Sequence, residues 1–302
     1  MEIRHLQYIT EIMRHNSFTK AAQALHITQP SISKMIKGLE NELSLEVFNR
    51  DSKQVKLTDT GETIVRYAQP ILQLFDDLMT ELHDLSSLRK GSIRIGLPPM
   101  TGANFFPVVM KQFQERYPGI AVQMVEEGAK KIEEWLGEGS LDVGVVLLPV
   151  DPDSYHVIPL VQEQVMVAMH PGHRLAAKEQ LALEELAEEP FLLFASGFAL
   201  HDRIIAACEQ AGFMPRIVYE SSQWDFLREM AAANLGITML PETICRSFDP
   251  GKVKAVPLAR PVIPWQPAMA WRKEGYLSHA SRAWIAFIEQ KFSRSSGETG
   301  DL

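Results

Sequence analysis

The sequence has 302 residues, of which 46% are hydrophobic, and its formal net charge is −8 at pH 7. This composition indicates a soluble globular protein of about two or three domains. The negative net charge argues against a protein that covers nucleic acid without sequence preference, but a local basic patch would still allow sequence-specific DNA binding. No stretch approaches the roughly 18 consecutive apolar residues of a membrane span, and the first ten residues do not resemble a signal peptide. The two cysteines, Cys208 and Cys245, have no metal-binding spacing, so we expect a cytoplasmic protein.

Residues 17–43 carry two short amphipathic patterns that are separated by a turn. Ser17 can cap the first helix, and His26–Thr28 is too short for anything but a tight turn. Thr28 can cap the second helix, whose first turn tolerates Pro30 because N–H groups there lack intrahelical partners. This pattern predicts a helix-turn-helix, whose second helix enters the major groove of DNA.

The polar side of the second predicted helix carries side chains suited to DNA. Gln29 and Ser33 can read base edges, and lysines on the same side suit phosphates. The next stretch, "LEVFNRDSKQVKLTDTG", predicts a strand, a polar turn and a second strand over 55–57, with basic residues gathered as in a DNA-contacting wing. The alternative is an ordinary helical hairpin with a solvated polar face. The candidate DNA-binding residues are Thr28, Gln29, Pro30, Ser31, Ser33, Lys34, Lys37, Arg50 and Lys53.

Thr58 or Asp59 can cap a long helix that reaches about Leu88. Its apolar residues recur at alternating steps of four and three, which predicts a coiled-coil seam, while Pro70 lies off the seam and predicts a bend. The alternative is a helix that packs on its own domain. Dimerisation is favoured because a palindromic DNA site needs two recognition helices at a fixed spacing. The candidate dimerisation residues are Ile64, Ile71, Phe75, Leu78, Leu82 and Leu85.

After Gly91, predicted strands and helices alternate. A strand over 93–97, a helix over about 105–117, the strand "GIAVQMVEE", a helix over 130–136 and the strand "LDVGVVLL" predict a parallel α/β sheet. A second such unit starts near Glu163, and the last strand and helix can return to the first unit. We therefore expect an α/β protein with an N-terminal winged helix-turn-helix over 1–58, a linker helix over 59–89 and a two-lobed effector-binding domain over 90–302. Lobe I would span about 90–162 and 267–293, and lobe II about 163–266.

Clefts between α/β lobes bind ligands beyond the carboxyl ends of strands, where helix N-termini offer free N–H groups. Two loops, "PPMTGAN" and "ASGFALHD", fit that position, and "SSQWDF" opens a third helix whose Gln223 or Trp224 could face the cleft. Their hydroxyls can equally cap their own helices, but convergence on one cleft would favour a small anion, with a carboxylate expected. The candidate effector-binding residues are Pro99, Met100, Thr101, Gly102, Ser196, Gly197, Phe198, Gln223 and Trp224; no metal or other cofactor is expected.

Residues 1–88 resemble the N-terminal part of a LysR-type transcriptional regulator. The matching motifs are "SFTKAAQALHITQPSISKMIKGLENEL", "LEVFNR" and "VKLTDTG". The two-lobed part also resembles LysR effector domains, which are similar to periplasmic solute-binding proteins. The resemblance implies a linker-helix dimer, often a tetramer, that bends operator DNA at an interrupted palindrome, and it leaves RNA polymerase open as a further partner.

Three later stretches resemble the CidR-type subgroup: "IRIGLPPMTG", "SSQWDFLREMAAANLGI" and "PVIPWQPAMAWRKEGYLSHASRAW". That resemblance implies a link to holin-like genes and overflow metabolism, with acetate or pyruvate as the effector. It leaves open the operator, the regulated genes, activation or repression, and dimer or tetramer.

Two other function classes are disfavoured. No catalytic motif such as G-x-S-x-G, H-E-x-x-H or a P-loop occurs, and neighbouring His201 and Asp202 on a helix would not face each other, so we expect no enzyme and no catalytic residues. A solute-binding protein without DNA activity is opposed by residues 1–60 and by the missing signal peptide.

Overall fold

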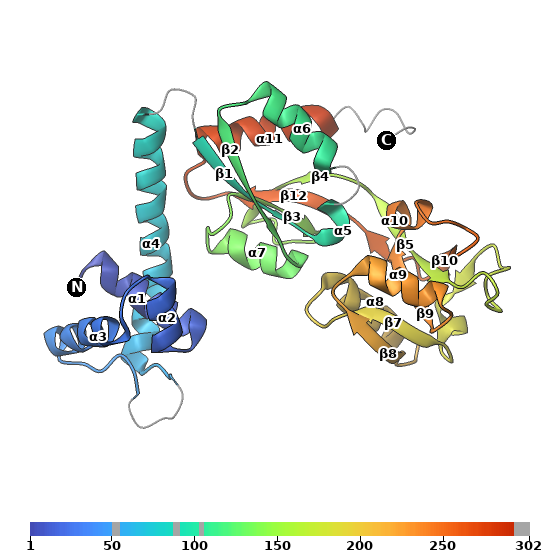
Figure 1. The fold of residues 1–302 in the computed structure, drawn as a ribbon, viewed down its shortest axis with the longest axis horizontal. Helices are drawn as coiled ribbons and strands as arrows, with labels where there is room; N and C mark the ends of the chain where they lie inside the picture. The colour runs from blue at the N-terminus through green and yellow to red at the C-terminus, as the bar shows by residue number, and fades with distance from the viewer. Residues whose placement is uncertain (50–54, 87–90, 103–105, 293–302) are drawn as a thin grey trace. The chain divides into compact units, whose positions relative to one another are not determined.

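The computed structural model describes residues 1–49, 55–86, 91–102 and 106–292, and it divides into two compact units, residues 1–86 and 87–302 (Figure 1). No helix within these described ranges is long and apolar enough to span a membrane. The four helices of the N-terminal unit are α1 (Ile3–His15), α2 (Phe18–Ala24), α3 (Gln29–Leu43) and α4 (Asp59–Ser86).

The core of the N-terminal unit forms where the apolar faces of its helices meet. Ile9 and Ile12 of α1, which the sequence analysis did not anticipate as a helix, are fully buried together with Ile32 and Leu39 of α3. Small Ala21 is also fully buried, which lets α2 pack closely on its neighbours. The helix-turn-helix thus rests on a three-helix core.

The wing differs from its prediction. In the part of the wing that the structure describes, an antiparallel bridge between Phe48 and Leu57 takes the place of the two strands, and the Asn49 N–H donates to the Lys56 carbonyl at 2.8 Å. Residues 50–54 lie outside the described residues.

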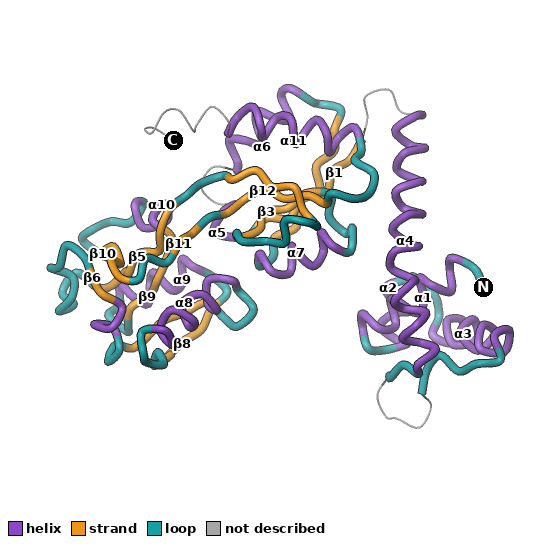
Figure 2. Tube along the Cα trace, turned by 180° about the vertical axis from the view of Figure 1, so that it is seen from behind, coloured by secondary structure: helices purple, strands orange, loops and turns teal. Residues whose placement is uncertain are grey.

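Lobe I of the C-terminal unit is a five-stranded sheet with the strand order β2-β1-β3-β12-β4. Helices α6 and α11 cover one face of this sheet and α7 covers the other (Figures 1 and 2). Its elements are β1 (Gly91–Leu97), α5 (Pro99–Gly102), α6 (Phe106–Arg116), β2 (Ile120–Glu126), α7 (Ala129–Gly137), β3 (Val143–Leu147), β4 (Tyr155–Pro159), β12 (Pro267–Arg272) and α11 (His279–Phe292).

Lobe II is built on a seven-stranded sheet with the order β6-β10-β5-β9-β7-β8, in which β11 pairs with β5 off this path. Its elements are β5 (Glu163–Met169), β6 (Leu181–Ala182), η1 (Leu183–Leu186), β7 (Pro190–Phe194), α8 (Ala199–Gln210), β8 (Arg216–Ser221), α9 (Trp224–Ala232), β9 (Ile237–Pro241), α10 (Glu242–Arg246), β10 (Lys254–Arg260) and β11 (Pro264–Trp265).

Two chain segments cross between the lobes, one from β4 to β5 and one from β11 to β12 (Figure 2). Because β12 returns to lobe I antiparallel to both β3 and β4, the lobe I sheet is mixed and not purely parallel as the alternating pattern predicted. Strands β1, β2 and β3 are mutually parallel, so their carboxyl ends lie at one edge, as a ligand cleft requires.

Candidate functional site

The first turn of α3 is capped as its sequence predicts. Thr28 accepts a hydrogen bond from the Ser31 backbone N–H at 3.4 Å, and the two hydroxyls lie 2.8 Å apart. Pro30 occupies the first turn, and Thr28, Pro30 and Ser31 are all exposed. The start of the helix is therefore capped and open to solvent.

Four further candidate side chains follow on α3. The Gln29 Nε2 atom donates to the Ser33 hydroxyl at 2.8 Å, which orients the carboxamide along the helix surface. Gln29, Lys34 and Lys37 are exposed, and Ser33 is half-buried, whereas Ile32 and Ile36 point into the core. The helix thus presents one polar and basic face, whose polar side chains suit hydrogen bonds to base edges and whose lysines suit phosphates.

The base of the wing is fixed by a buried carboxylate that the sequence analysis missed. Glu40 of α3 accepts hydrogen bonds from the Val47 N–H at 2.9 Å and the Phe48 N–H at 3.3 Å. It is only 7% exposed, and the Thr58 N–H donates to the Val47 carbonyl at 3.0 Å. Arg50 and Lys53, the two wing candidates for DNA contact, lie outside the described residues.

The candidate seam on α4 divides into a buried part and an exposed part. Ile64 packs against the core of its own unit, and Ala68 is fully buried. The later residues leave that core: Ile71 is 42%, Phe75 39%, Leu78 50% and Leu82 51% exposed. The side chain of Leu85 lies outside the described part of the chain. An apolar stripe of this length on one helix face is typical of a partner surface.

Of the candidate effector residues in lobe I, Met100 and Thr101 on α5 are buried. Met100 joins a hydrophobic cluster otherwise made mostly of lobe II residues, so α5 lies where the lobes meet. The Thr101 hydroxyl is buried and has no hydrogen-bond partner among the described residues. Pro99 begins α5 and is half-buried, and Gly102 ends it.

The candidate residues in lobe II precede two helices. Phe198 is the N-cap of α8, and its ring packs against Phe194 at 5.4 Å. Ser196 and Gly197 just before it are exposed, and Gly197 has a φ of +99°, which a residue with a Cβ adopts only with strain. Gln223 is the exposed N-cap of α9, and half-buried Trp224 packs on the lobe II core.

The two lobes contact each other through charged residues that the sequence analysis did not place in the cleft. Lys130 of α7 forms an ion pair with Asp202 of α8. The other oxygen of Asp202 lies 2.9 Å from the Nδ1 atom of His201, so the expectation that these two neighbours do not face each other was wrong. The next residue, Arg203, donates to the Leu148 carbonyl of lobe I and also, at 2.8 Å, to the Pro264 carbonyl of its own lobe. A sequence pattern could not reveal the contacts of Lys130 and Arg203 because each joins residues more than 50 positions apart.

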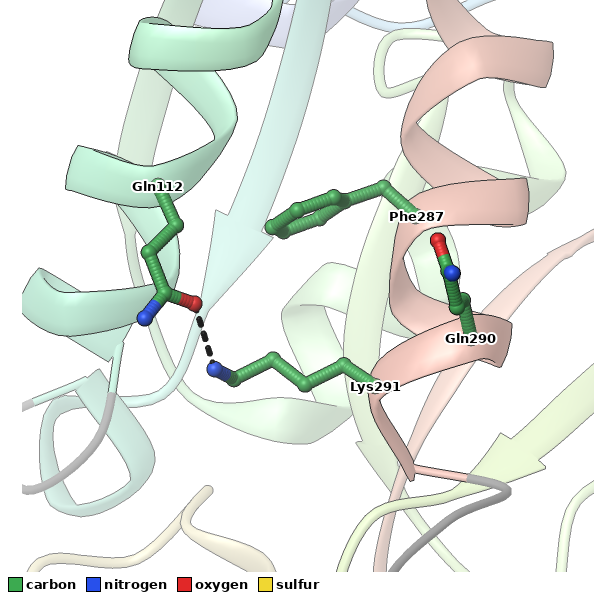
Figure 3. A pocket seen from close by; sticks show the side chains of 4 residues that line it. All are labelled: Gln112, Phe287, Gln290 and Lys291. Carbon is green, nitrogen blue, oxygen red and sulfur yellow. Dashed lines mark hydrogen bonds between the residues drawn. The ribbon is translucent and has the colours of Figure 1, made fainter.

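The cysteine thiols, the metal-ligating side chains and the pocket between α6 and α11 give weaker support for a functional site. Burial raises the pKa of the thiols of Cys208 and Cys245 to about 12, so neither forms a thiolate near neutral pH. The described residues hold no cluster of three or more metal-ligating side chains. A shallow pocket between α6 and α11 is lined by Gln112, Phe287, Gln290 and Lys291, but Lys291 already donates to Gln112 at 2.6 Å (Figure 3).

Two family models match this chain. Residues 3–62 match the bacterial regulatory helix-turn-helix protein of the lysR family, and residues 86–293 match the LysR substrate binding domain. Together these matches disfavour the alternative of a solute-binding protein that lacks DNA activity.

Known regulators resemble the chain over nearly its whole length. The uncharacterized HTH-type transcriptional regulator YwbI of Bacillus subtilis (strain 168) is 53% identical over 285 residues, covering 94% of this chain and 95% of YwbI. Full-length OxyR from Pseudomonas aeruginosa is 27% identical, with a TM-score of 0.67 and coverage of 100% of this chain and 99% of OxyR. Full-length CbnR in complex with its target DNA shares the fold, with a TM-score of 0.63, 19% identity and coverage of 96% and 99%.

Proposed function

The chain belongs to the LysR family of DNA-binding transcriptional regulators, and we propose that it controls transcription in response to a small carboxylate bound between the lobes of its C-terminal domain. In this proposal residues 1–58 read the operator, α4 joins two copies, and residues 90–302 sense the effector. RNA polymerase is the partner through which a bound regulator would act on transcription.

The polar face of α3 supports the proposed reading of the operator. Gln29 is held by Ser33, which leaves its Oε1 atom and its second N–H to face a base edge as a pair. Lys34 and Lys37 are exposed on the same helix and suit phosphates, as would Arg50 and Lys53 of the wing.

Ser33→Ala and Lys34→Ala should separate base reading from phosphate contact. Ser33→Ala is expected to weaken binding to the operator by about 1–3 kcal/mol while hardly affecting random duplex. Lys34→Ala should weaken binding to both duplexes and reduce the salt slope by about one. Competition binding at several salt concentrations measures both effects, with Lys111→Ala, an exposed lysine of α6, as the control. Equal losses on operator and random duplex for Ser33→Ala would remove Ser33 from base recognition.

Self-association is proposed through two surfaces. The exposed residues of α4 from Ile71 to Leu82 would pair two chains. Strands β2 and β8, each one of the two outer strands of its sheet, carry exposed Met124 and Tyr219 and would add the second contact that a tetramer needs.

The buried hydroxyl of Thr101 is the observation that carries the effector proposal. A buried hydroxyl loses its hydrogen bonds to water, and the Thr101 hydroxyl has no replacement partner among the described residues, so it is free to donate to a ligand acceptor. Its position in α5, after the carboxyl end of β1 and against the lobe II cluster, is where α/β folds bind ligands. The resemblance to the CidR-type subgroup makes acetate or pyruvate the first effectors to test, with holin-like or overflow-metabolism genes as targets.

Thr101→Val tests this assignment because valine has nearly the shape of threonine without the hydroxyl. The unliganded variant should be as stable as the wild type or up to about 1 kcal/mol more stable, whereas its response to acetate or pyruvate should fall by about tenfold or more. Thermal unfolding with and without ligand measures both quantities. Thr238→Val is the matched control, since Thr238 in β9 is also a buried threonine whose hydroxyl has no partner among the described residues. A ligand response that is unchanged in Thr101→Val would contradict the proposal, whatever the response of Thr238→Val.

A further inference from the structure

The two chain segments that cross between the lobes are joined to each other by backbone hydrogen bonds. The Leu160 N–H donates to the Pro267 carbonyl at 3.0 Å, and further along β5 pairs with β11. Residues 160–165 and 263–267 thus form a two-stranded ribbon, which we call the hinge ribbon. Because both crossing segments belong to it, a change in the angle between the lobes has to bend the hinge ribbon.

One side chain connects the hinge ribbon to both lobes. Arg203, in the second turn of α8, donates from Nη1 to the Pro264 carbonyl at 2.8 Å and from Nη2 to the Leu148 carbonyl, just beyond β3 of lobe I. The Leu148 N–H in turn donates to the Gln266 carbonyl at 3.1 Å. The guanidinium, Leu148 and residues 264–266 therefore form a closed ring of hydrogen bonds at the point where the chain passes from one lobe to the other.

The guanidinium group suits this position because of its shape. Arginine holds its donors in a planar fork, so one head group can fix two carbonyl oxygens at a set separation, whereas a lysine ammonium has no such fork. Burial lowers the pKa of Arg203, so the group is partly withdrawn from water, where a charge is costly unless it is hydrogen-bonded. Its bonds to Leu148 and Pro264 meet that requirement, and they hold lobe I against the hinge ribbon.

We propose that Arg203 is a positioning residue that fixes the angle between the two lobes and transmits movements of α8 to the hinge ribbon. Leu200 and Ile204, on either side of it in α8, are each 1% exposed in the lobe II core, so the helix moves with that core. The candidate effector residues 196–198 directly precede α8. A ligand at these residues would thus act on the hinge ribbon through Arg203, and this part of the inference rests on the proposed function.

A second contact between the lobes is weaker than the one that Arg203 makes. Lys130 pairs with Asp202, but the side chains are 51% and 43% exposed, so solvent screens their attraction. The bonds of Arg203 are better shielded, and one of them falls on the hinge ribbon itself. Loss of Arg203 should therefore loosen the lobes even where the ion pair is intact.

Hydrogen–deuterium exchange of the full-length protein tests this inference at the backbone. Arg203→Met keeps most of the apolar length of the side chain and removes its donors, so the N–H groups of Leu148, Leu160 and Val165 should exchange about tenfold faster or more. Arg203→Lys keeps the charge but cannot hold two carbonyls at once, so the same N–H groups should again exchange faster than in the wild type. The N–H groups of β9, inside the lobe II sheet, should be unchanged.

Arg228→Met is the matched control. Arg228 is a half-buried arginine of the same lobe that lies over the rings of Trp224 and Phe248, so its loss should leave exchange in the hinge ribbon at the wild-type rate. Wild-type exchange of the hinge ribbon in Arg203→Met or in Arg203→Lys would overturn the inference. Equal acceleration in the hinge ribbon and in β9 would also overturn it, because Arg203 would then stabilise lobe II as a whole.

The transmission of an effector signal through Arg203 is tested by titrating the full-length protein with acetate or pyruvate and with operator DNA. Arg203→Met should bind the acid within about threefold of the wild-type affinity, but the acid should change its operator affinity by less than about twofold. An acid effect on operator binding as large as that of the wild type would overturn transmission through Arg203. If the wild type binds neither acid, the proposed carboxylate effector fails, and hydrogen exchange still decides whether Arg203 fixes the lobe angle.

Discussion

Replacing Ile71 and Leu78 with aspartate is expected to convert the protein to monomers and to weaken operator binding by about a hundredfold or more. Both side chains are exposed on α4, at 42% and 50%, so the substitutions place charges on its apolar stripe without disturbing the core of the unit. A dimer gains effective concentration at its second half-site, and a monomer loses that advantage. Analytical ultracentrifugation and operator titration measure the two effects.

The control for this experiment is Gln69→Asp, which adds an exposed negative charge to the opposite side of the same helix. It should leave both assembly and operator affinity close to those of the wild type. An unchanged sedimentation coefficient for the Ile71→Asp, Leu78→Asp variant would show that α4 does not join the chains.

Glu40→Ala is expected to destabilise the N-terminal unit by about 3 kcal/mol. The substitution leaves the Val47 and Phe48 N–H groups buried without their carboxylate acceptor, and each unsatisfied donor costs about 1–3 kcal/mol. Because small domains are only marginally stable, operator binding should be lost at physiological temperature while carboxylate binding persists in the C-terminal unit. Circular dichroism melts with both binding assays report this split.

Glu42→Ala is the matched control, since Glu42 is an exposed glutamate two positions along the same helix. We expect little change in its melting profile. If Glu40→Ala melts and binds operator like the wild type, the buried carboxylate does not hold the wing.

Local patterns in the sequence were sufficient to predict most helices. The capping residues Ser17 and Thr28 begin α2 and α3 as expected, because a cap depends on residues only three positions away. The predicted helices over about 105–117 and over 130–136 occur as α6 (Phe106–Arg116) and α7 (Ala129–Gly137). The predicted fold class, a helix-turn-helix with a two-lobed α/β domain, is confirmed.

Features that depend on distant parts of the chain could not be predicted. The antiparallel direction of β12 depends on where the chain returns to lobe I, and a local sequence pattern carries no information about that position. Ile64 continues the heptad pattern of Ile71, yet it packs in its own unit because α1 is there to receive it. The partners of Lys130 and Arg203 in the other lobe are likewise fixed by lobe packing.

The central claim is that carboxylate binding in the C-terminal domain changes operator binding by the N-terminal domain. Fluorescence anisotropy with labelled operator, titrated with full-length protein in the presence and absence of acetate or pyruvate, tests it most directly. Coupling between two sites typically changes affinity by about 5- to 150-fold, so a shift within that range is predicted for the wild type, with little or none for Thr101→Val. An operator affinity that is the same with and without saturating acid would contradict the account.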